Sequence, residues 1–331
     1  MHFLLTLALI VLAAVAVLAL FTFLVARRVD AAFPAPGQWL EVAGERIHYR
    51  ELGQGPPIVL VHGLAGESRN FDYLPLQQLA QHWRIVLVDR PGSGHSPRAD
   101  ESTARIAEQA RLLAAFIRAL HFDRPPLLVG HSLGGAIALA VALQDPDSIA
   151  GLGLIAPLTH FSPAVPAPFR AMAIRTPWIR RAFAHTLAAP LAIVNTRAVL
   201  AALFGPDPAP RDFGARGGGF RSLRPQSFVG ASTDMAAIGA DLPAQQERYG
   251  ELRLPVRILY GEGDRILDWR AQGEALRAKV PQAELRVIPG GHMLPVTHAA
   301  ATAAWLEETA RAVHDPARPA TLCGIGQHCG Q

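Results

Sequence analysis

The sequence predicts an α/β fold with a mainly parallel sheet, and two features of the chain support this prediction. The first is a series of short apolar runs that suit strands buried on both faces. These runs are PPIVLVHG, RIVLVDRPG, PLLVGHS, IAGLGLIAP, VRILYGEGD and AELRVIPGGH. The second is that segments with apolar residues at helical spacing separate the runs. A chain in which strands and helices alternate typically forms a parallel sheet covered by helices on both faces.

The chain begins with a long apolar segment, which we expect to be a membrane anchor formed by residues 1–28. From Phe3 to Ala26 there are 24 residues without a charge, and about 20 helical residues cross the hydrocarbon core of a bilayer. A cleaved secretory signal is the alternative, although its apolar region usually has only about 7–15 residues. We expect a single-pass protein of the bacterial inner membrane. Arg27 and Arg28 favour a cytoplasmic body, but two arginines leave the side open.

Residues 29–38 are rich in proline and small residues and are predicted to be a linker. The segment that follows alternates apolar and polar residues on either side of Ala43 and Gly44, a pattern typical of a β-hairpin. We expect the catalytic core to comprise residues 39–156 and 255–314. Helices are predicted within STARIAEQARLLAAFIRAL, SLGGAIALAVALQ and HAAATAAWLEETARAVH.

About a hundred residues interrupt this alternation, and we expect residues 157–254 to be an inserted helical cap or lid. Helical patterns occur in FRAMAIRTPWIRRAF and LAAPLAIVNTRAVLAALFG, whereas GARGGGFRSLRPQ reads as a loop. The insertion contains 11 arginines and 6 acidic residues. This excess of positive charge is compatible with a face toward anionic lipid headgroups, with binding of an anionic product, or with a solvated surface.

Composition narrows the function classes further. The formal net charge is only +4, and no cluster of basic and aromatic residues resembles a nucleic-acid-binding module, so we expect no nucleic-acid partner. The two cysteines, Cys323 and Cys329, lie in residues 315–331, which we expect to form a disordered tail. Their spacing also allows a small disulfide or, with His328, a metal site.

One serine stands where an apolar strand changes abruptly into an alanine-rich helix. Gly130-His131-Ser132-Leu133-Gly134 matches the G-x-S-x-G nucleophile elbow, in which a tight turn projects the serine hydroxyl beyond the strand end. The N-terminal N–H groups of the next helix favour negative charge that forms at that hydroxyl. The context therefore predicts that Ser132 is a nucleophile; a glycine-rich helix start that merely packs closely is the alternative.

A serine needs a base, and the base needs an acid that fixes its tautomer. Among 13 histidines, His292 follows the last predicted strand in a glycine-rich loop. Asp264 follows the penultimate strand, at the carboxyl end where open α/β sheets place their sites. We therefore predict Ser132, Asp264 and His292 as the catalytic residues. The fallback acids are Asp268 and Glu262, and the fallback base is His298, expected one turn into the last helix.

The oxyanion of an acyl-transfer reaction needs two hydrogen-bond donors. The backbone N–H of Leu133, directly after the nucleophile, is the first that we predict. The second is the backbone N–H of Leu64, in the loop that follows the strand IVLV. His62 is expected to organise this loop by hydrogen bonding, and Asp89 and His95 are expected to be structural.

Taken together, VHGLAG, DRPGSGHS, GHSLGG, GEGD and GGH make the chain resemble the α/β-hydrolase fold superfamily, in its serine esterase and lipase group. The resemblance covers about residues 39–314. It implies an eight-stranded, mostly parallel sheet with a cap inserted after the sixth strand. An anchor combined with a cap is similar to membrane-bound monoacylglycerol lipases. Haloalkane dehalogenases and epoxide hydrolases of the same fold carry an aspartate nucleophile, so Ser132 argues against both.

The leading hypothesis is a membrane-anchored enzyme that hydrolyses a carboxylic ester with a lipophilic acyl chain through an acyl-enzyme, without a cofactor or metal. Its partners would be a small-molecule or lipid ester and the membrane; the oligomeric state stays open. The cap residues Phe169, Met172, Trp178 and Phe183 either line an acyl pocket or form the core of the cap. The alternatives are acyl transfer, perhydrolysis or carbon–carbon bond hydrolysis by the same triad, and a ligand receptor without catalysis.

Overall fold

A computed structural model describes residues 1–315 of the chain. Cys323, Cys329 and all of the expected tail except Asp315 therefore lie outside the described residues. Eight strands form one sheet in the order β1-β2-β4-β3-β5-β6-β7-β8. Their bounds are β1 Gln38–Val42, β2 Glu45–Leu52, β3 Pro57–Val61, β4 Arg84–Val88, β5 Leu127–His131, β6 Gly151–Ile155, β7 Val256–Gly261 and β8 Glu284–Ile288. β2 runs antiparallel to β1 and β4, and the other neighbouring pairs are parallel. The predicted fold class is confirmed.

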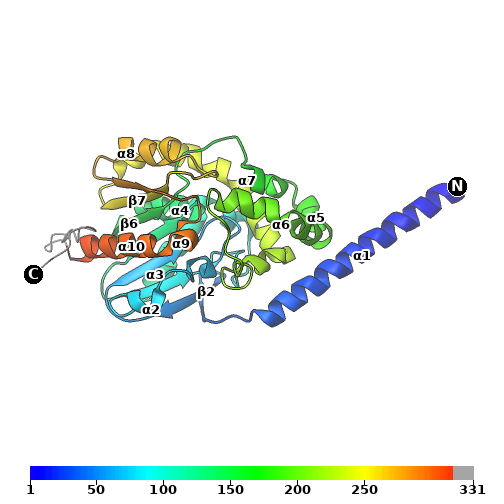
Figure 1. Cartoon of the computed structure of the whole chain (residues 1–331), viewed down its shortest axis with the longest axis horizontal. Helices are drawn as coiled ribbons and strands as arrows, with labels where there is room; N and C mark the ends of the chain where they lie inside the picture. The colour runs from blue at the N-terminus through cyan, green and yellow to red at the C-terminus, as the bar shows by residue number, and fades with distance from the viewer. Residues whose placement is uncertain (316–331) are drawn as a thin grey trace, which may run out of the picture.

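Along the chain the helices alternate with most of the strands, and in space they lie around the sheet (Figure 1). Their bounds are α1 His2–Ala32, α2 Leu76–Leu79, α3 Ile106–Ala119, α4 Leu133–Gln144, α5 Pro177–Thr186, α6 Ala188–Phe204, α7 Pro225–Glu247, α8 Ala275–Lys279, α9 Leu294–Thr297 and α10 Ala299–His314. Short 3₁₀ helices are η1 Ser68–Phe71, η2 Glu101–Ala104, η3 Pro146–Ser148, η4 Ala167–Met172, η5 Gly219–Leu223 and η6 Tyr249–Glu251, and η7 Arg270–Glu274 is a π-helical turn.

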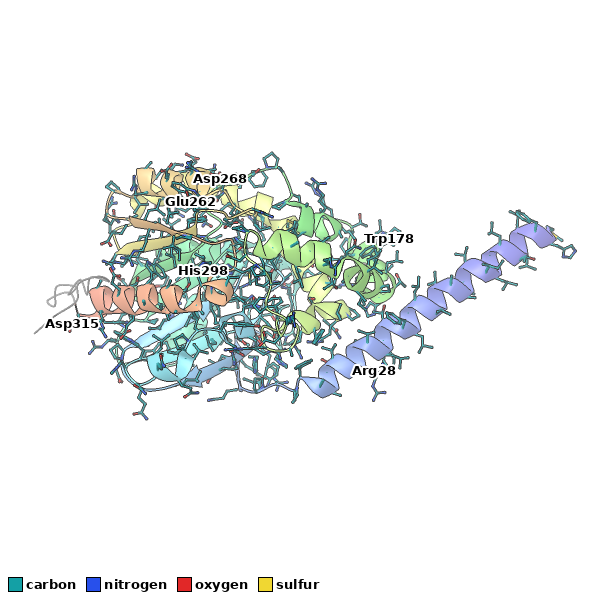
Figure 2. All side chains as sticks on the ribbon, in the orientation of Figure 1. Arg28, Trp178, Glu262, Asp268, His298 and Asp315 are labelled. Atoms are coloured by element: carbon teal, nitrogen blue, oxygen red, sulfur yellow. The ribbon has the colours of Figure 1, made fainter. Side chains whose placement is uncertain are left out.

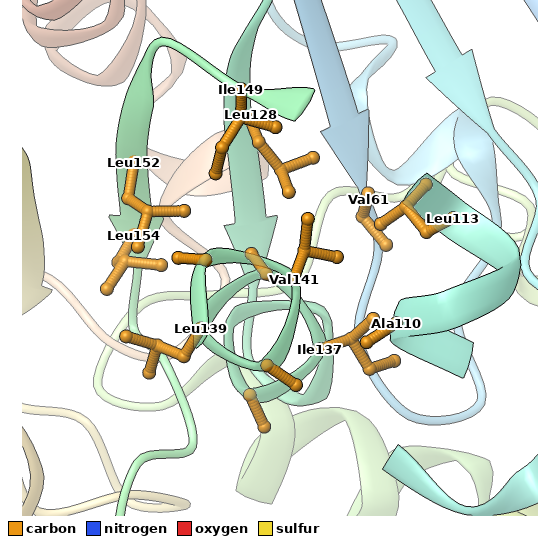
Figure 3. Packing of buried hydrophobic residues seen from close by; sticks show 14 of the residues in the cluster. Val61, Ala110, Leu113, Leu128, Ile137, Leu139, Val141, Ile149, Leu152 and Leu154 are labelled. Atoms are coloured by element: carbon orange, nitrogen blue, oxygen red, sulfur yellow. The ribbon is translucent and has the colours of Figure 1, made fainter. Parts of the chain in front are cut away.

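Two apolar layers sandwich the sheet, because successive side chains of a strand point to opposite faces. Val59 and Val61 of β3 pack in a cluster with α3, α4 and α8, whereas Ile58 and Leu60 pack in a second cluster with α2 and α10. All four side chains are buried. Figure 3 shows the first cluster, where α3 and α4 lie against the central strands. This double burial explains why the strands read as unbroken apolar runs.

The predicted hairpin is formed by β1 and β2. Val42 pairs with Glu45 across the turn, and the two turn residues, Ala43 and Gly44, have φ of +49° and +84°. Positive φ at both central residues matches the right-handed twist of the strands.

The chain between β6 and β7 forms α5, α6 and α7 with η4, η5 and η6. The two helical patterns of this segment correspond to η4 with α5, interrupted at residues 173–176, and to α6. The loop expected around Gly217 is short, since the chain enters η5 and then the 23-residue helix α7, which the sequence did not indicate. Gly230, Gly239 and Pro243 lie inside α7 and weaken its helical pattern.

The helix α1 extends four residues past the expected end of the anchor, to Ala32, and packs against α5, α6 and η5. Its N-terminal part points away from the sheet (Figure 1). Within residues 1–315, α1 is the one helix that by itself is long and apolar enough to cross a membrane. The helices α5 and α6 pass the same test only as a pair and are bent by 73° at their junction.

Candidate active site

The serine of the elbow sits between β5 and α4 in a backbone conformation that L-residues rarely adopt. Ser132 has φ of 54° and ψ of −120°, which stores strain on the order of 1–3 kcal/mol. A Cβ at Gly134 would lie 2.3 Å from the carbonyl oxygen of Val61, and one at Gly130 would lie 2.3 Å from that of Gly134. The glycines on either side therefore allow the helix to start directly against the neighbouring strand.

The structure brings Asp264 and His292 into direct contact from the ends of neighbouring strands. Nδ1 of His292 lies 2.7 Å from Oδ2 of Asp264, and both side chains are almost fully buried. The other oxygen of Asp264 accepts the backbone N–H groups of Ile266 at 2.8 Å and Leu267 at 2.9 Å. The carboxylate is thus fixed by three hydrogen bonds and orients the imidazole, with Nε2 of His292 left on the side away from Asp264.

His131, the residue before Ser132, binds the backbone of His292. Nε2 of His131 donates to the backbone carbonyl of His292 at 3.0 Å, and the two rings lie 5.0 Å apart. Burial and the nearby His292 lower the pKa of His131 to about 3, so His131 is neutral at pH 7 and keeps this donor role. Because His131 precedes Ser132 directly, the loop that carries His292 packs against the nucleophile elbow.

The loop after β3 approaches the serine closely. A Cβ at Gly63 would lie 2.8 Å from Cβ and 3.3 Å from Oγ of Ser132. In the described part of the chain, the backbone N–H groups of Leu64 and Leu133 have no hydrogen-bond acceptor, as an oxyanion site requires of its donors. His62 bonds within this loop, through Nδ1 to the carbonyl of Gly63 at 2.9 Å.

The fallback residues take part in other contacts. Asp268 accepts the N–H groups of Arg270 and Ala271 and so caps a helix, and Glu262 is exposed at the end of β7. His298 precedes α10 as its N-cap instead of lying one turn into it, and its Nδ1 is 3.5 Å from Asp207. Figure 2 marks Glu262 and Asp268 near one edge of the body and His298 on the chain before α10.

The expected structural residues of the turn after β4 lie in a buried network. Asp89 contacts Nδ1 of His48 at 2.8 Å and accepts the backbone N–H of His95 at 2.9 Å.

Of the four aromatic and Met residues of the cap, Phe183 packs against Phe228 with ring centroids 5.2 Å apart. Trp178 does not belong to the cap core, because it is 71% exposed.

Sequence reasoning missed three residues that connect the cap and the core to the site loops. Asp207 accepts the backbone N–H of Gly291, next to His292, at 3.1 Å. Asp234 of α7 forms an ion pair with Arg90 at 2.7 Å. Arg90 belongs to the DRPG turn, which the sequence singled out, but nothing in the sequence pairs it with the cap. No group of three His, Cys, Asp or Glu side chains that would hold a metal occurs in residues 1–315.

A mostly parallel eight-stranded sheet, a serine on a strand–turn–helix elbow after β5 and an Asp–His pair after β7 and β8 define an α/β hydrolase. The family model described as "alpha/beta hydrolase fold" matches residues 56–299. The chain belongs to this family, and an esterase is among its relatives.

Individual proteins agree with this assignment. The chain is 32% identical over 252 residues to the pimeloyl-[acyl-carrier protein] methyl ester esterase of Chromobacterium violaceum. The alignment covers 74% of this chain and 89% of that protein. An alpha/beta hydrolase fold protein of Burkholderia ambifaria aligns with a TM-score of 0.67 and 26% identity, over 82% of this chain and 98% of that one. A membrane phospholipase A shares the fold with a TM-score of 0.60 and 21% identity, over 95% and 99% of the two chains.

Proposed function

We propose that this protein is a membrane-anchored serine hydrolase that cleaves a lipophilic carboxylic ester through an acyl-enzyme. The observation that carries the proposal is the 2.7 Å contact between Asp264 and His292, in a loop packed on the elbow of Ser132. A carboxylate that holds Nδ1 leaves Nε2 as the base for a serine hydroxyl. The relationship to an esterase over most of the chain supports ester hydrolysis.

The proposed reaction has two halves. In the first, Nε2 of His292 takes the hydroxyl proton of Ser132 as Oγ attacks the ester carbonyl, and the resulting oxyanion accepts the N–H groups of Leu64 and Leu133. The tetrahedral intermediate expels the alcohol, which takes the proton from His292, and leaves an acyl-serine. In the second half, water attacks the acyl-serine as Nε2 of His292 takes a proton from the water. The bond between the acyl carbon and Oγ of Ser132 then breaks, His292 returns the proton to Oγ, and the carboxylic acid is released.

The contacts of α1 favour a retained anchor over a cleaved signal. Thr22 is buried, and its Oγ1 donates to the carbonyl of Thr186 at the end of α5, at 3.1 Å. Near the end of the helix, Asp30 forms ion pairs with Arg224 at 3.0 Å and Arg221 at 3.8 Å. A segment removed after export would leave these partners on the cap without their contacts.

The same contacts support a substrate that comes from the bilayer. Thr22 lies four residues before the end of the apolar span, about 6 Å along a helix axis, so the corner between α5 and α6 would meet the membrane surface. Exposed apolar side chains gather on these two helices and at their junction: Trp178, Ile179, Leu187, Leu191, Ile193 and Val194. Trp178 lies on the side of the cap that faces α1 (Figure 2). Residues 157–204 include five arginines and no acidic residue, which suits anionic headgroups.

The proposed activity is tested with a fluorophosphonate probe and a series of esters graded by acyl length, using the full chain in detergent micelles. We expect the probe to label Ser132 and the enzyme to hydrolyse at least one ester. Ser132→Ala should lose labelling and at least about 10³-fold in activity, because the residues of a triad act as a unit. An unlabelled, inactive wild-type protein that is folded would favour a ligand receptor on the same fold.

The anchor is tested separately. Membranes from expressing cells are washed with alkaline carbonate, and the mass of the intact protein is measured. We expect the protein to stay in the membrane fraction with α1 present. Release into the wash, with a mass that lacks the first 30 or so residues, would identify α1 as a cleaved signal.

A further inference from the structure

A buried arginine connects the cap to the loop that would bind the oxyanion. Arg90 follows β4 and is 3% exposed. Its Nε donates to the carbonyl of His62 at 3.1 Å, and Nη2 donates to the carbonyl of Gly63 at 2.8 Å. Its Nη1 donates to Gln109 and to Asp234, each at 2.7 Å. One guanidinium therefore joins two consecutive carbonyls of the loop to a carboxylate from α7 of the cap.

These bonds fix the peptide between Gly63 and Leu64. The carbonyl of Gly63 accepts from Arg90 and from Nδ1 of His62. Nδ1 carries the hydrogen because Nε2 of His62 accepts the backbone N–H of Arg90 at 3.1 Å; burial and Arg90 lower the pKa of His62 to about 3, so the ring is neutral. In a trans peptide the C=O and N–H groups point to opposite sides. With the carbonyl held toward Arg90, the N–H of Leu64 is turned away from this network.

Asp234 of the cap fixes the position of Arg90. Both oxygens of Asp234 are used, since Oδ2 accepts from Arg90 and Oδ1 accepts from Nη2 of Arg98 at 2.6 Å. Asp234 is buried, and removing one member of a buried ion pair leaves the other without compensation. Although burial opposes ionisation, Arg98 and Arg90 keep the pKa of Asp234 below its usual value. Arg90 therefore has its full set of partners only while α7 is seated on the core.

We propose that Arg90 is a positioning residue that sets the Gly63–Leu64 peptide for oxyanion binding, and that Asp234 holds Arg90 in this position. Seating of the cap and stabilisation of the oxyanion are then coupled through one side chain. This inference rests on the proposed ester hydrolysis and adds a role for residues outside the triad. Neither Arg90 nor Asp234 touches the substrate.

The test compares Asp234→Asn and Arg90→Lys with a matched control on the same helix. Asp241 of α7 also pairs with an arginine of the core, since its Oδ1 accepts from Nε of Arg105 at 3.0 Å, but it contacts none of the loop. Each full-length variant is titrated with the fluorophosphonate, so that rates are expressed per labelled site. A boronic acid matched to the best ester serves as a mimic of the tetrahedral intermediate.

We expect Asp234→Asn and Arg90→Lys to lower kcat about 10- to 100-fold with KM changed less than about 3-fold, since the loss falls on the transition state. The inhibition constant of the boronic acid should rise in parallel. Asp241→Asn should stay within about 3-fold of wild type in all three quantities. A purely structural role of Asp234 would reduce the number of labelled sites but not the rate per site.

Gln109→Leu keeps both charges and serves if the charge variants do not fold; it removes the neutral acceptor of Arg90 together with the bonds from Nε2 of Gln109 to Asp234 and to the carbonyl of Ala104. It should lower kcat in the same direction by a smaller factor, again with the inhibition constant following. Rates per site and boronic acid affinities equal to those of Asp241→Asn would overturn the inference while leaving ester hydrolysis intact. An unlabelled and inactive wild type would instead refute the proposed function and the coupling with it.

Discussion

At the scale of single residues, Ser132 carries the proposed nucleophile on an unfavourable backbone conformation. Its φ of 54° and ψ of −120° suit glycine far better than a residue with a Cβ. The surrounding structure holds this conformation, because the backbone N–H of Ser132 donates to the carbonyl of Ile155 and its carbonyl accepts from Leu158 and Gly135. The elbow is thus kept in place by its neighbours at a cost to stability.

This strain predicts that Ser132→Gly is more stable than Ser132→Ala. Glycine relieves strain of about 1–3 kcal/mol and loses about 0.5–1 kcal/mol through the entropy of the unfolded chain, so we expect a net difference of roughly 1 kcal/mol. Urea denaturation of the two variants measures it, and both should be inactive. Equal midpoints would mean that the turn is not strained.

A second residue-scale prediction concerns the acid. Asp264→Asn should lower kcat by about 10³- to 10⁴-fold, because an amide in this place favours the wrong tautomer of the imidazole. Asp268→Asn is the control in the same loop; it weakens a helix cap but should keep nearly full activity. Ester hydrolysis by the purified variants gives the comparison, and a larger loss in Asp268→Asn would assign the acid to Asp268 instead.

At the scale of elements, Gly63 lies where the loop after β3 approaches the elbow between β5 and α4. The two segments are so close that no side chain fits at Gly63. A Cβ there would be 2.8 Å from Cβ of Ser132, so Gly63→Ala must displace one of the two segments. We expect a loss of activity of about 10²-fold, comparable to the loss of an oxyanion donor. Stability should fall by about 1–3 kcal/mol, as in overpacked cores.

Gly250→Ala is the control for this prediction, because the nearest atom to an added Cβ is the carbonyl oxygen of Lys279 at 3.8 Å. Its ester hydrolysis should stay within about 2-fold of wild type, as expected for a substitution without new contacts. A fully active Gly63→Ala would mean that the loop does not contribute to the reaction.

The elements also indicate which parts of the fold and site the sequence could predict. Strands buried on both faces leave a strong pattern, and Ser132 and Asp264 follow such strands at their carboxyl ends. His292 follows the edge strand β8, which is only partly buried. The helix α7 leaves a weak pattern, since glycines and a proline interrupt it. Which arginine faces Asp234 depends on how the cap sits on the core, and this packing has no local sequence signal.

At the scale of the whole molecule, the cap contacts both loops of the candidate site. Asp234 reaches the loop of Gly63 through Arg90, and Asp207 accepts the N–H of Gly291 beside His292. An apolar cluster of Phe204, Phe213, Met293 and Val296 packs the cap against the chain that follows His292. Because α1 in turn packs on the cap, an anchored α1 would hold the cap at a fixed orientation to the membrane.

The buried histidines predict how the stability of the whole protein depends on pH. The pKa values of His62 and His131 are lowered to about 3, by burial together with Arg90 and His292 respectively. Unfolded histidine titrates near 6.5, so between these values the unfolded chain binds more protons than the folded protein. The stabilisation is complete above about pH 6.5 and is lost as the pH falls, by about 1.4 kcal/mol per pH unit for each histidine.

One buried carboxyl acts in the opposite direction. Burial and the nearby Asp89 raise the pKa of Glu67 to about 7, so the folded protein binds this proton more readily than the unfolded chain at pH 5 to 6.5. Its protonation therefore adds stability as the pH falls and offsets one of the two histidines. These three groups together give a slope of one proton, or about 1.4 kcal/mol per pH unit, and the half-buried His95, whose pKa burial and Arg221 lower to about 3, steepens it further.

Urea denaturation of the full chain in detergent micelles at pH 7.5, 6.5, 5.5 and 5.0 measures this slope. His131→Gln should flatten the slope between pH 6.5 and 5.0, because one proton uptake on unfolding is removed while an amide N–H still faces the carbonyl of His292. Glu67→Gln should steepen the slope, because it removes a proton that the folded protein binds more readily than the unfolded chain. If both variants kept the slope of the wild type, these buried groups would not be the ones that link the stability of the fold to pH.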